Sequence, residues 1–386
     1  MAPGTADKAR GIEMGTPPRG SSPKTTDRVN PVKGNGSLLF KAGPAAFEDV
    51  RKHGFSIDRI GTIAGASGGA KWLVLSQVDR VIADRVLPKL AAPVHLIGSS
   101  IGSWRHSCYA QSDPLAAIDR FESAYLDQTY SPNPDMQEIS DKAREILHHL
   151  FDEHGAAQVI SHPVLRSHIM TVRSGFLTSS DSRLQLSFGL TVAATANLIN
   201  RRALGAFFSR GLFYDARDLP PFVDAKGFPL QQIMLSEENI VDAAAASASV
   251  PLVIAGVENI KGAPVGVYRD GGVIDYHLDL PLCEPDRLTL FPHFSERLIP
   301  GWFDKKLSWR KPNPQHTDRT ILICPSAEFV SRLPFGKIPD RTDFLKMDQD
   351  QRMQSWRKTV NACRELADDL ADVLDNGRVA ARLQPL

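Results

Sequence analysis

The chain has 386 residues, of which 42% are hydrophobic, and its 45 Lys and Arg residues nearly balance 44 Asp and Glu residues. A chain of this size and composition can bury a substantial core. Because the net charge is only +1, no overall field favours nucleic acid or another polyanion as a partner. The longest apolar runs fall short of the roughly 18 residues that a membrane-spanning helix requires.

The N-terminal segment, residues 1–36, differs from the rest in composition. It holds six Gly, five Pro and no aromatic residue. Such a segment cannot bury enough apolar surface to offset the entropy of ordering, so a disordered tail is expected here, followed by a single domain over 37–386. The segment lacks the apolar centre of a signal peptide, and the four cysteines are widely spaced without a C-x-x-C pair. A cytoplasmic protein with reduced thiols is therefore expected.

From residue 37 onward, short apolar runs alternate with helical patterns. The predicted helix at 45–53 has Pro44 at its start and Gly54 just past its end, the expected asymmetry of helix termini. Strands that alternate with helices predict a three-layer α/β fold, in which a mostly parallel central sheet is covered by helices on both faces. In such sheets, ligands bind at the carboxyl ends of the strands. The predicted strands are 37–40, 60–64, 94–97, 169–172 and 321–324.

Three later regions carry distinct patterns. Helices predicted at 114–127 and 135–151 form an insertion beside or over the site, and an amphipathic C-terminal helix at 344–375 is expected to dock on the domain. The segment 288–311 combines bulky apolar and aromatic residues with a cluster of cations at 305–311. This combination suits the edge of an anionic lipid surface, although a segment packed into the core is the alternative.

Two glycine-flanked serines follow predicted strands. Ser67 lies in the motif G-A-S-G-G at 65–69, after the strand at 60–64 and before a helical pattern. Strand, tight turn and helix is the context of a G-x-S-x-G nucleophile elbow. A second match places Ser100 in G-S-S-I-G, after the strand at 94–97. Far downstream, Asp270 precedes two glycines and follows a short apolar run.

Together these motifs resemble the patatin-like acyl hydrolases, or patatin-like phospholipases, over roughly residues 37–280. That family uses a G-x-S-x-G serine and an Asp from a D-G-[GA] motif, with no histidine. The resemblance implies that Ser67 is the nucleophile, that Asp270 is its base, and that lipid carboxylic esters are cleaved through an acyl-enzyme. Ser100, Trp104 and Arg105 are then expected to line the substrate pocket.

The oxyanion loop of that family is a run of three glycines, then any residue, then Arg or Lys. The segment that resembles it follows the first predicted strand, at 41–44, but it keeps only Gly43 of the glycine run. The resemblance implies an oxyanion hole made of the Ala42, Gly43 and Gly68 N–H groups, with Lys41 in the pocket. Because each lost donor costs ~3 kcal/mol, this departure predicts a slow enzyme rather than an inactive one.

Several alternatives remain open at this point. Ser67 and Asp270 are followed by His277, His293 and His316, in the chain order of an α/β-hydrolase triad. A polyhydroxyalkanoate depolymerase and a lipid-binding protein without turnover also fit the resemblance. No metal-ligand cluster or calcium loop is visible, so no metal or other cofactor is expected. The expected partners are a lipid ester substrate and, by peripheral contact, an anionic membrane or lipid surface.

Overall fold

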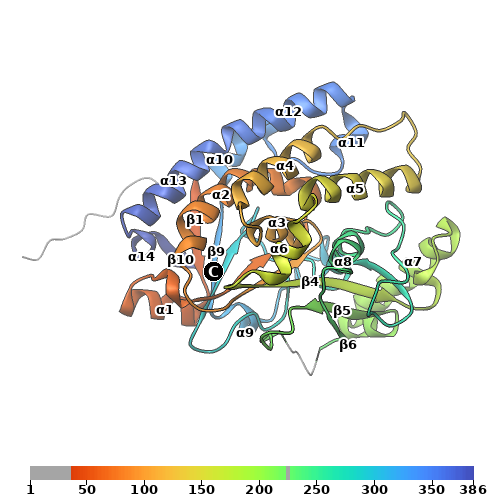
Figure 1. Cartoon of the computed structure of the whole chain (residues 1–386), viewed down its shortest axis with the longest axis horizontal. Coiled ribbons are helices and arrows are strands. Elements are labelled where there is room, and N and C mark those ends of the chain that lie inside the picture. Colours follow the sequence, from red (N-terminus) through yellow and green to blue (C-terminus); the bar gives the residue numbers. More distant parts are fainter. Residues whose placement is uncertain (1–35, 223–226) are drawn as a thin grey trace, which may run out of the picture. The chain divides into compact units, whose positions relative to one another are not determined.

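A mixed, mostly parallel sheet organises the chain, as the alternation of strands and helices predicts (Figure 1). The computed structural model describes residues 36–222 and 227–386, so the tail expected over 1–36 falls, except for its last residue, outside the described residues. Within the described part, nine of the ten strands follow the order β10-β1-β9-β8-β2-β3-β4-β5-β6, and the tenth, β7, pairs with β4. The strands are Leu38–Ala42 (β1), Ile60–Gly65 (β2), Val94–Ser99 (β3), Leu165–Ser174 (β4), Phe208–Tyr214 (β5), Leu230–Met234 (β6), Val267–Asp270 (β7), Leu288–Pro292 (β8), Thr320–Pro325 (β9) and Leu383–Pro385 (β10).

Helices cover this sheet and complete a three-layer α/β fold, with α4, α5, α12 and α13 gathered on one side (Figure 1). Strands β2, β3 and β9 are buried along their whole length, as expected for parallel strands enclosed by helices. The helices are Pro44–His53 (α1), Ser76–Val81 (α2), Ile101–Tyr109 (α3), Pro114–Leu126 (α4), Met136–Phe151 (α5), Gly155–Ser161 (α6), Arg183–Ile199 (α7), Ile240–Ser247 (α8), Pro314–Thr317 (α9), Ala327–Arg332 (α10), Asp343–Lys346 (α11), Gln349–Ala362 (α12), Arg364–Asp375 (α13) and Val379–Arg382 (α14).

Local signals account for several of these boundaries. Pro44 opens α1, and Gly54 ends it with a φ of 79°, a conformation that glycine adopts without strain. The amphipathic C-terminal pattern forms α11, α12 and α13 in place of one long helix. These helices pack on the domain: Trp356 is fully buried, stacks on Tyr125 and meets Phe344 edge to face.

The segment 288–311 contributes mainly to the core, which corrects the expectation that it faces a lipid surface as a whole. Its first residues form β8, and Phe291, Leu298 and Leu307 are buried. Trp309 is an exception, because it is largely exposed. Among the described residues, no helix is long and apolar enough to cross a membrane.

Candidate active site

The turn after β3 has the backbone of a sharp elbow. Ser100 lies between the end of β3 and the start of α3, with φ 55° and ψ −129°. Non-glycine residues rarely adopt positive φ, and such strain gathers at functional sites. The flanking glycines are sterically required, since a Cβ atom on Gly98 would overlap the backbone of Ser103, and one on Gly102 would overlap that of Gly65. The G-x-S-x-G spacing at 98–102 is therefore explained by close backbone packing around Ser100.

The sheet register brings Ser100 to Asp270. Strand β3 pairs with the first part of β4, ending with Ser99 opposite Met170. Strand β7 pairs with the last part of β4, and Asp270 lies opposite Thr171, the next residue along. The hydroxyl of Ser100 donates a hydrogen bond to Asp270 Oδ2 at 2.8 Å. Two segments 170 residues apart in the chain thus meet in a buried serine–carboxylate pair.

The environment of Asp270 makes its carboxylate a stronger base than usual. Burial raises the pKa of Asp270 to about 6, while hydrogen bonds from the Ser100 hydroxyl and the Gly272 N–H group act in the opposite direction. The Gly272 bond to Oδ1 is 2.7 Å long. The positive charges of Lys305 and Arg341 also lower the pKa of Asp270, by less than burial raises it. The carboxylate is consequently ionised near neutral pH and accepts a proton more readily than an exposed aspartate.

Ser67 lies beside this pair without bonding to the carboxylate. Its hydroxyl donates to Ser99 Oγ at 2.9 Å, and its N–H group donates to the Tyr276 carbonyl. A Cβ atom on Gly272 would lie 2.5 Å from Ser67 Oγ and 2.9 Å from Asp270 Oδ1, so the serine borders the same small space. The hydrogen bond expected between Ser67 and Asp270 is therefore not present in this structure. Strand β3, not β2, adjoins β4, so the elbow after β3 meets Asp270.

The loop after β2 offers two unused donors. The N–H groups of Gly68 and Gly69 make no hydrogen bond with any described residue. Gly69 has a φ of 56°, which only glycine adopts readily. Because Gly65 pairs with Gly98, this loop and the Ser100 elbow leave neighbouring strands at the same edge of the sheet.

Two lysines near this loop have no carboxylate within ion-pair distance among the described residues. Lys71 Nζ lies 4.8 Å from the centre of the Phe294 ring, and Lys305 Nζ lies 3.9 Å from that of Tyr276. Burial lowers the pKa of both ammonium groups, that of Lys305 to about 7. The site is thus bordered by two lysines that lack a paired carboxylate within the part of the chain that the structure describes.

The expected oxyanion segment lies elsewhere in the sheet, which corrects that part of the site. Strand β1, which ends at Ala42, is separated from β2 by β9 and β8. The Gly43 N–H group donates to the Thr320 carbonyl, so it is already used. Lys41 forms an ion pair with Glu296 at 2.6 Å, so its charge is already paired. Of the three expected donors, only Gly68 lies at the site.

Trp104 and Arg105 belong to the core and not to a pocket, which corrects a second expectation. The Trp104 indole donates to the Ala244 carbonyl at 3.0 Å. Arg105 is buried and donates to both oxygens of Asp79, at 2.8 and 2.6 Å. The same carboxylate accepts from the Tyr109 hydroxyl at 2.6 Å. These groups satisfy one another inside the layer of helices.

The histidines of the alternative triad make other contacts. His277 Nδ1 accepts from the Ile299 N–H group, and His293 Nδ1 lies within hydrogen-bond distance of the Ser295 backbone. Burial lowers the pKa of His293 to about 3, so its ring is neutral. His316 contacts Asp279 at 2.8 Å. Within the described residues, none of the three hydrogen-bonds to a candidate serine or to Asp270.

A family model described as patatin-like phospholipase matches residues 65–277, which is more than half of the chain. The matched region contains Ser67, Ser100 and Asp270, and it begins after the segment 41–44. A search of curated proteins finds no match.

Two solved structures are similar to this chain at low sequence identity. VipD from Legionella pneumophila is 11% identical, with 87% of this chain and 70% of that chain covered and a TM-score of 0.33. Human GIVD cytosolic phospholipase A2 is 10% identical, with 87% and 62% covered and a TM-score of 0.38. This chain therefore spans less than two thirds of the human protein.

Proposed function

The chain belongs to the patatin-like phospholipase family, and we propose that it is a serine lipid acyl hydrolase whose catalytic dyad is Ser100 and Asp270. One observation carries this proposal. The serine with the strained elbow backbone is also the one whose hydroxyl donates to the buried carboxylate. A nucleophile paired with a base within hydrogen-bond distance is the signature of covalent catalysis.

In the proposed reaction, Asp270 Oδ2 accepts the proton of Ser100 as Oγ attacks the carbonyl carbon of a lipid ester. The tetrahedral intermediate collapses to an acyl-enzyme, and the alcohol leaves with the proton from Asp270. Water then attacks the acyl-enzyme with the same carboxylate as base, and the bond between the acyl carbon and Ser100 Oγ breaks as Asp270 returns the proton to Oγ, which releases the fatty acid. No metal or histidine takes part in these steps as proposed.

The negative oxygen of the intermediate needs donors, and the loop after β2 supplies candidates. The N–H groups of Gly68 and Gly69, which have no hydrogen-bond partner among the described residues, lie one strand away from Ser100. Residues 68–71 read Gly, Gly, Ala, Lys, which is closer to the family's pattern of glycines, any residue and a cation than 41–44 is. We infer that this loop is the oxyanion hole, with Ser67 at its edge. Each such donor typically contributes about 3 kcal/mol to the transition state.

The competing hypothesis keeps Ser67 as the nucleophile, as the sequence pattern suggests. The two serines are well matched for a direct comparison, because both are buried and both follow neighbouring parallel strands. They also fall on different tryptic peptides, 60–71 and 90–105. Labelling with a fluorophosphonate, followed by peptide mapping, therefore identifies the reactive serine directly.

We expect the adduct on peptide 90–105 at Ser100. Ser100→Ala should abolish labelling and reduce turnover of a p-nitrophenyl ester and of a phospholipid by about 10⁴-fold or more. Ser67→Ala should still be labelled at Ser100 and lose far less activity. An adduct on peptide 60–71 would instead establish Ser67.

Two other outcomes bear on the activity itself. Neither labelling nor turnover in a folded wild-type protein would favour a lipid-binding protein without catalysis. Hydrolysis of a polyhydroxyalkanoate film but not of phospholipid would assign the same dyad to a polyester substrate.

A further inference from the structure

Helix α7 carries an apolar face on each side, which is unusual for a helix at the surface. Leu186, Leu190 and Ala193 are buried against the core. On the opposite side, Leu184, Phe188 and Val192 recur at every fourth residue and are exposed. Leu184 is 83% and Phe188 61% exposed. An apolar stripe on the outer side of a surface helix, in addition to the stripe that faces the core, is left without a partner by the core packing.

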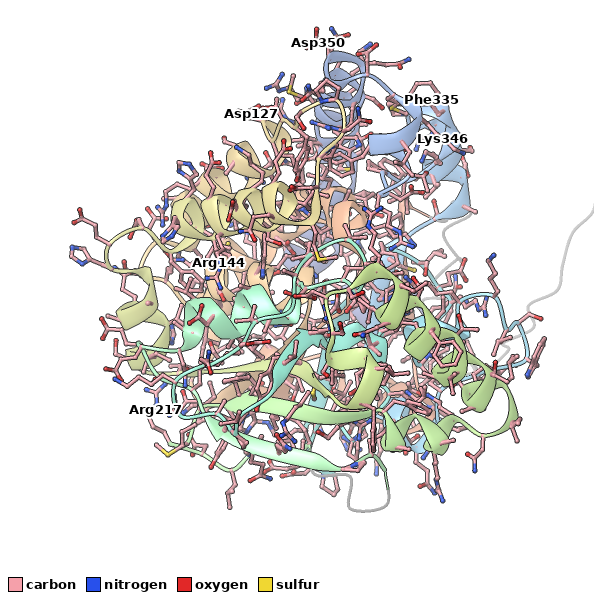
Figure 2. All side chains as sticks on the ribbon, turned by 90° about the vertical axis from the view of Figure 1, so that its right-hand side faces the viewer. Asp127, Arg144, Arg217, Phe335, Lys346 and Asp350 are labelled. Carbon is pink, nitrogen blue, oxygen red and sulfur yellow. The ribbon has the colours of Figure 1, made fainter. Side chains whose placement is uncertain are left out.

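The exposed apolar face continues onto neighbouring segments. Phe176 is 83% exposed, in the turn that packs beside Gly189 of α7. At the other end, Ile199 is 86% exposed. Arg310 donates to the Asn197 carbonyl at 2.8 Å, so exposed Trp309 lies next to the same end of the helix. We call Phe176, Leu184, Phe188, Val192, Ile199 and Trp309 the α7 surface. Figure 2 views the molecule from the side on which α7 lies in Figure 1.

Charge around the α7 surface is positive. Helix α7 contains no acidic residue. Exposed cations lie at Arg183, the first residue of the helix, and beyond it at Arg202, Lys306 and Lys311, and none of the four forms an ion pair with a described residue. Asp181, the acidic residue just before the helix, is bonded to Arg269. Apolar side chains are complementary to lipid acyl chains, and nearby cations that form no ion pair within the described residues are complementary to anionic headgroups.

Hydrogen bonds of Arg269 link the α7 surface to the strand that carries Asp270. Arg269, the residue before Asp270, is buried and donates to the Thr178 and Ser180 carbonyls and to Asp181. These three residues link the turn at Phe176 to the start of α7. The same arginine thus holds the exposed turn and the strand that carries the base.

We propose that the α7 surface docks the protein on an anionic lipid surface and so delivers lipid substrate to the site. The delivery of substrate rests on the proposed lipid hydrolase activity, whereas docking on the lipid surface requires no turnover. The lipid contact expected at the segment 288–311 is thereby placed on the α7 surface instead, and Trp309 is the residue of that segment that takes part in it.

The test uses the full chain and vesicles of phosphatidylcholine with or without phosphatidylglycerol. The variant is Leu184→Gln with Phe188→Gln. The matched control is Leu345→Gln with Phe335→Gln, because these side chains are 88% and 63% exposed and lie outside the α7 surface, with Phe335 labelled in Figure 2. All proteins also carry Ser100→Ala for the binding assay, so that hydrolysis does not alter the vesicles.

We expect binding that rises with phosphatidylglycerol and falls with salt, and that drops at least about tenfold in the α7 variant but not in the control. In proteins with Ser100 intact, the α7 variant should lose hydrolysis of vesicle phospholipid but keep hydrolysis of a soluble short ester.

Vesicle binding by the α7 variant equal to that of the parent protein, or an equal loss of binding in the control, would overturn the proposal. So would dissociation of a dimer by the α7 variant without an effect on vesicle binding, which would identify a second copy as the occupant. Failure of all proteins to cleave the soluble ester would count against the proposed activity alone, since vesicle binding is measured separately.

Discussion

Gly102 contacts Gly65 so closely that a Cβ atom on Gly102 would overlap the Gly65 carbonyl oxygen. This contact joins the first turn of α3 to the end of β2. It therefore holds the Ser100 elbow against the loop that carries the Gly68 and Gly69 N–H groups. The proposed nucleophile and oxyanion donors are positioned by one backbone contact that tolerates no side chain.

The first prediction follows from this contact. Gly102→Ala should destabilise the fold by about 1–3 kcal/mol, because the overlapped atoms are backbone and cannot turn aside. It should also lower turnover in the molecules that remain folded, since α3 must shift away from β2. Urea denaturation and ester hydrolysis measure the two effects.

Gly175→Ala is the control for this substitution. Its nearest neighbour would lie 3.5 Å from the added Cβ atom, an ordinary contact. A Gly102→Ala protein with wild-type stability and activity would show that the contact is not needed.

The second prediction concerns pH. Because the base must be ionised and burial raises the pKa of Asp270 to about 6, kcat/KM for a soluble ester should fall as the pH drops through about 6. The fall should persist in Ser67→Ala, which keeps the dyad. A rate that stays constant down to about pH 4 would mean that an ordinary exposed carboxylate, or no carboxylate, acts as base.

The third prediction adds Lys305 to this profile. Its charge lowers the pKa of Asp270, so Lys305→Met should move the acid limb of the kcat/KM profile to higher pH. Lys306→Met, at the exposed neighbouring position, is the control and should leave the limb in place. If the acid limb of the kcat/KM profile stays in place in both variants, the Lys305 ammonium does not act on the carboxylate.

The fourth prediction is that Asp270→Asn stabilises the protein near neutral pH. The folded-state pKa lies above the ordinary value of 3.8, so between these values the folded state binds more protons than the unfolded state. This contribution to stability therefore declines as pH rises from about 4 to about 6, and the ionised carboxylate costs about 1–3 kcal/mol above that range. Removing the charge should raise Tm near pH 7 and have little effect near pH 4. A lower Tm near pH 7 would indicate that the carboxylate's hydrogen bonds outweigh its burial.

Much of the fold could be predicted from local patterns. Apolar, β-branched runs bounded by turn residues marked β1, β2, β3, β4 and β9, because strands buried on both faces read as continuous apolar segments. Strand β6 was not predicted, since it reads Leu-Gln-Gln-Ile-Met and is partly exposed. Strand β8 was not predicted either, because it lies in an aromatic segment whose burial depends on tertiary packing.

The site was predicted less completely, because its two G-x-S-x-G motifs are locally alike. Both follow a buried parallel strand, so no local property decides between Ser67 and Ser100. The distinction arises from β7, which extends β4 where β3 ends and so places Asp270 beside Ser100. Residues 68–71 fit the family's oxyanion pattern better than 41–44 do, and an oxyanion loop at this position would place the proposed nucleophile after the next strand, at Ser100.

The last prediction tests the structural role of Arg105. Its guanidinium and the Asp79 carboxylate are both buried and form two hydrogen bonds. Asp79→Asn leaves the arginine charge buried without a full partner, so it should cost about 3–5 kcal/mol in urea denaturation. Lys261→Met, which removes an exposed ion pair with Glu238, should cost less than about 1 kcal/mol. If Arg105 instead bound substrate, Arg105→Met would raise KM for lipid esters with little loss of stability, so measuring both quantities decides between the two roles.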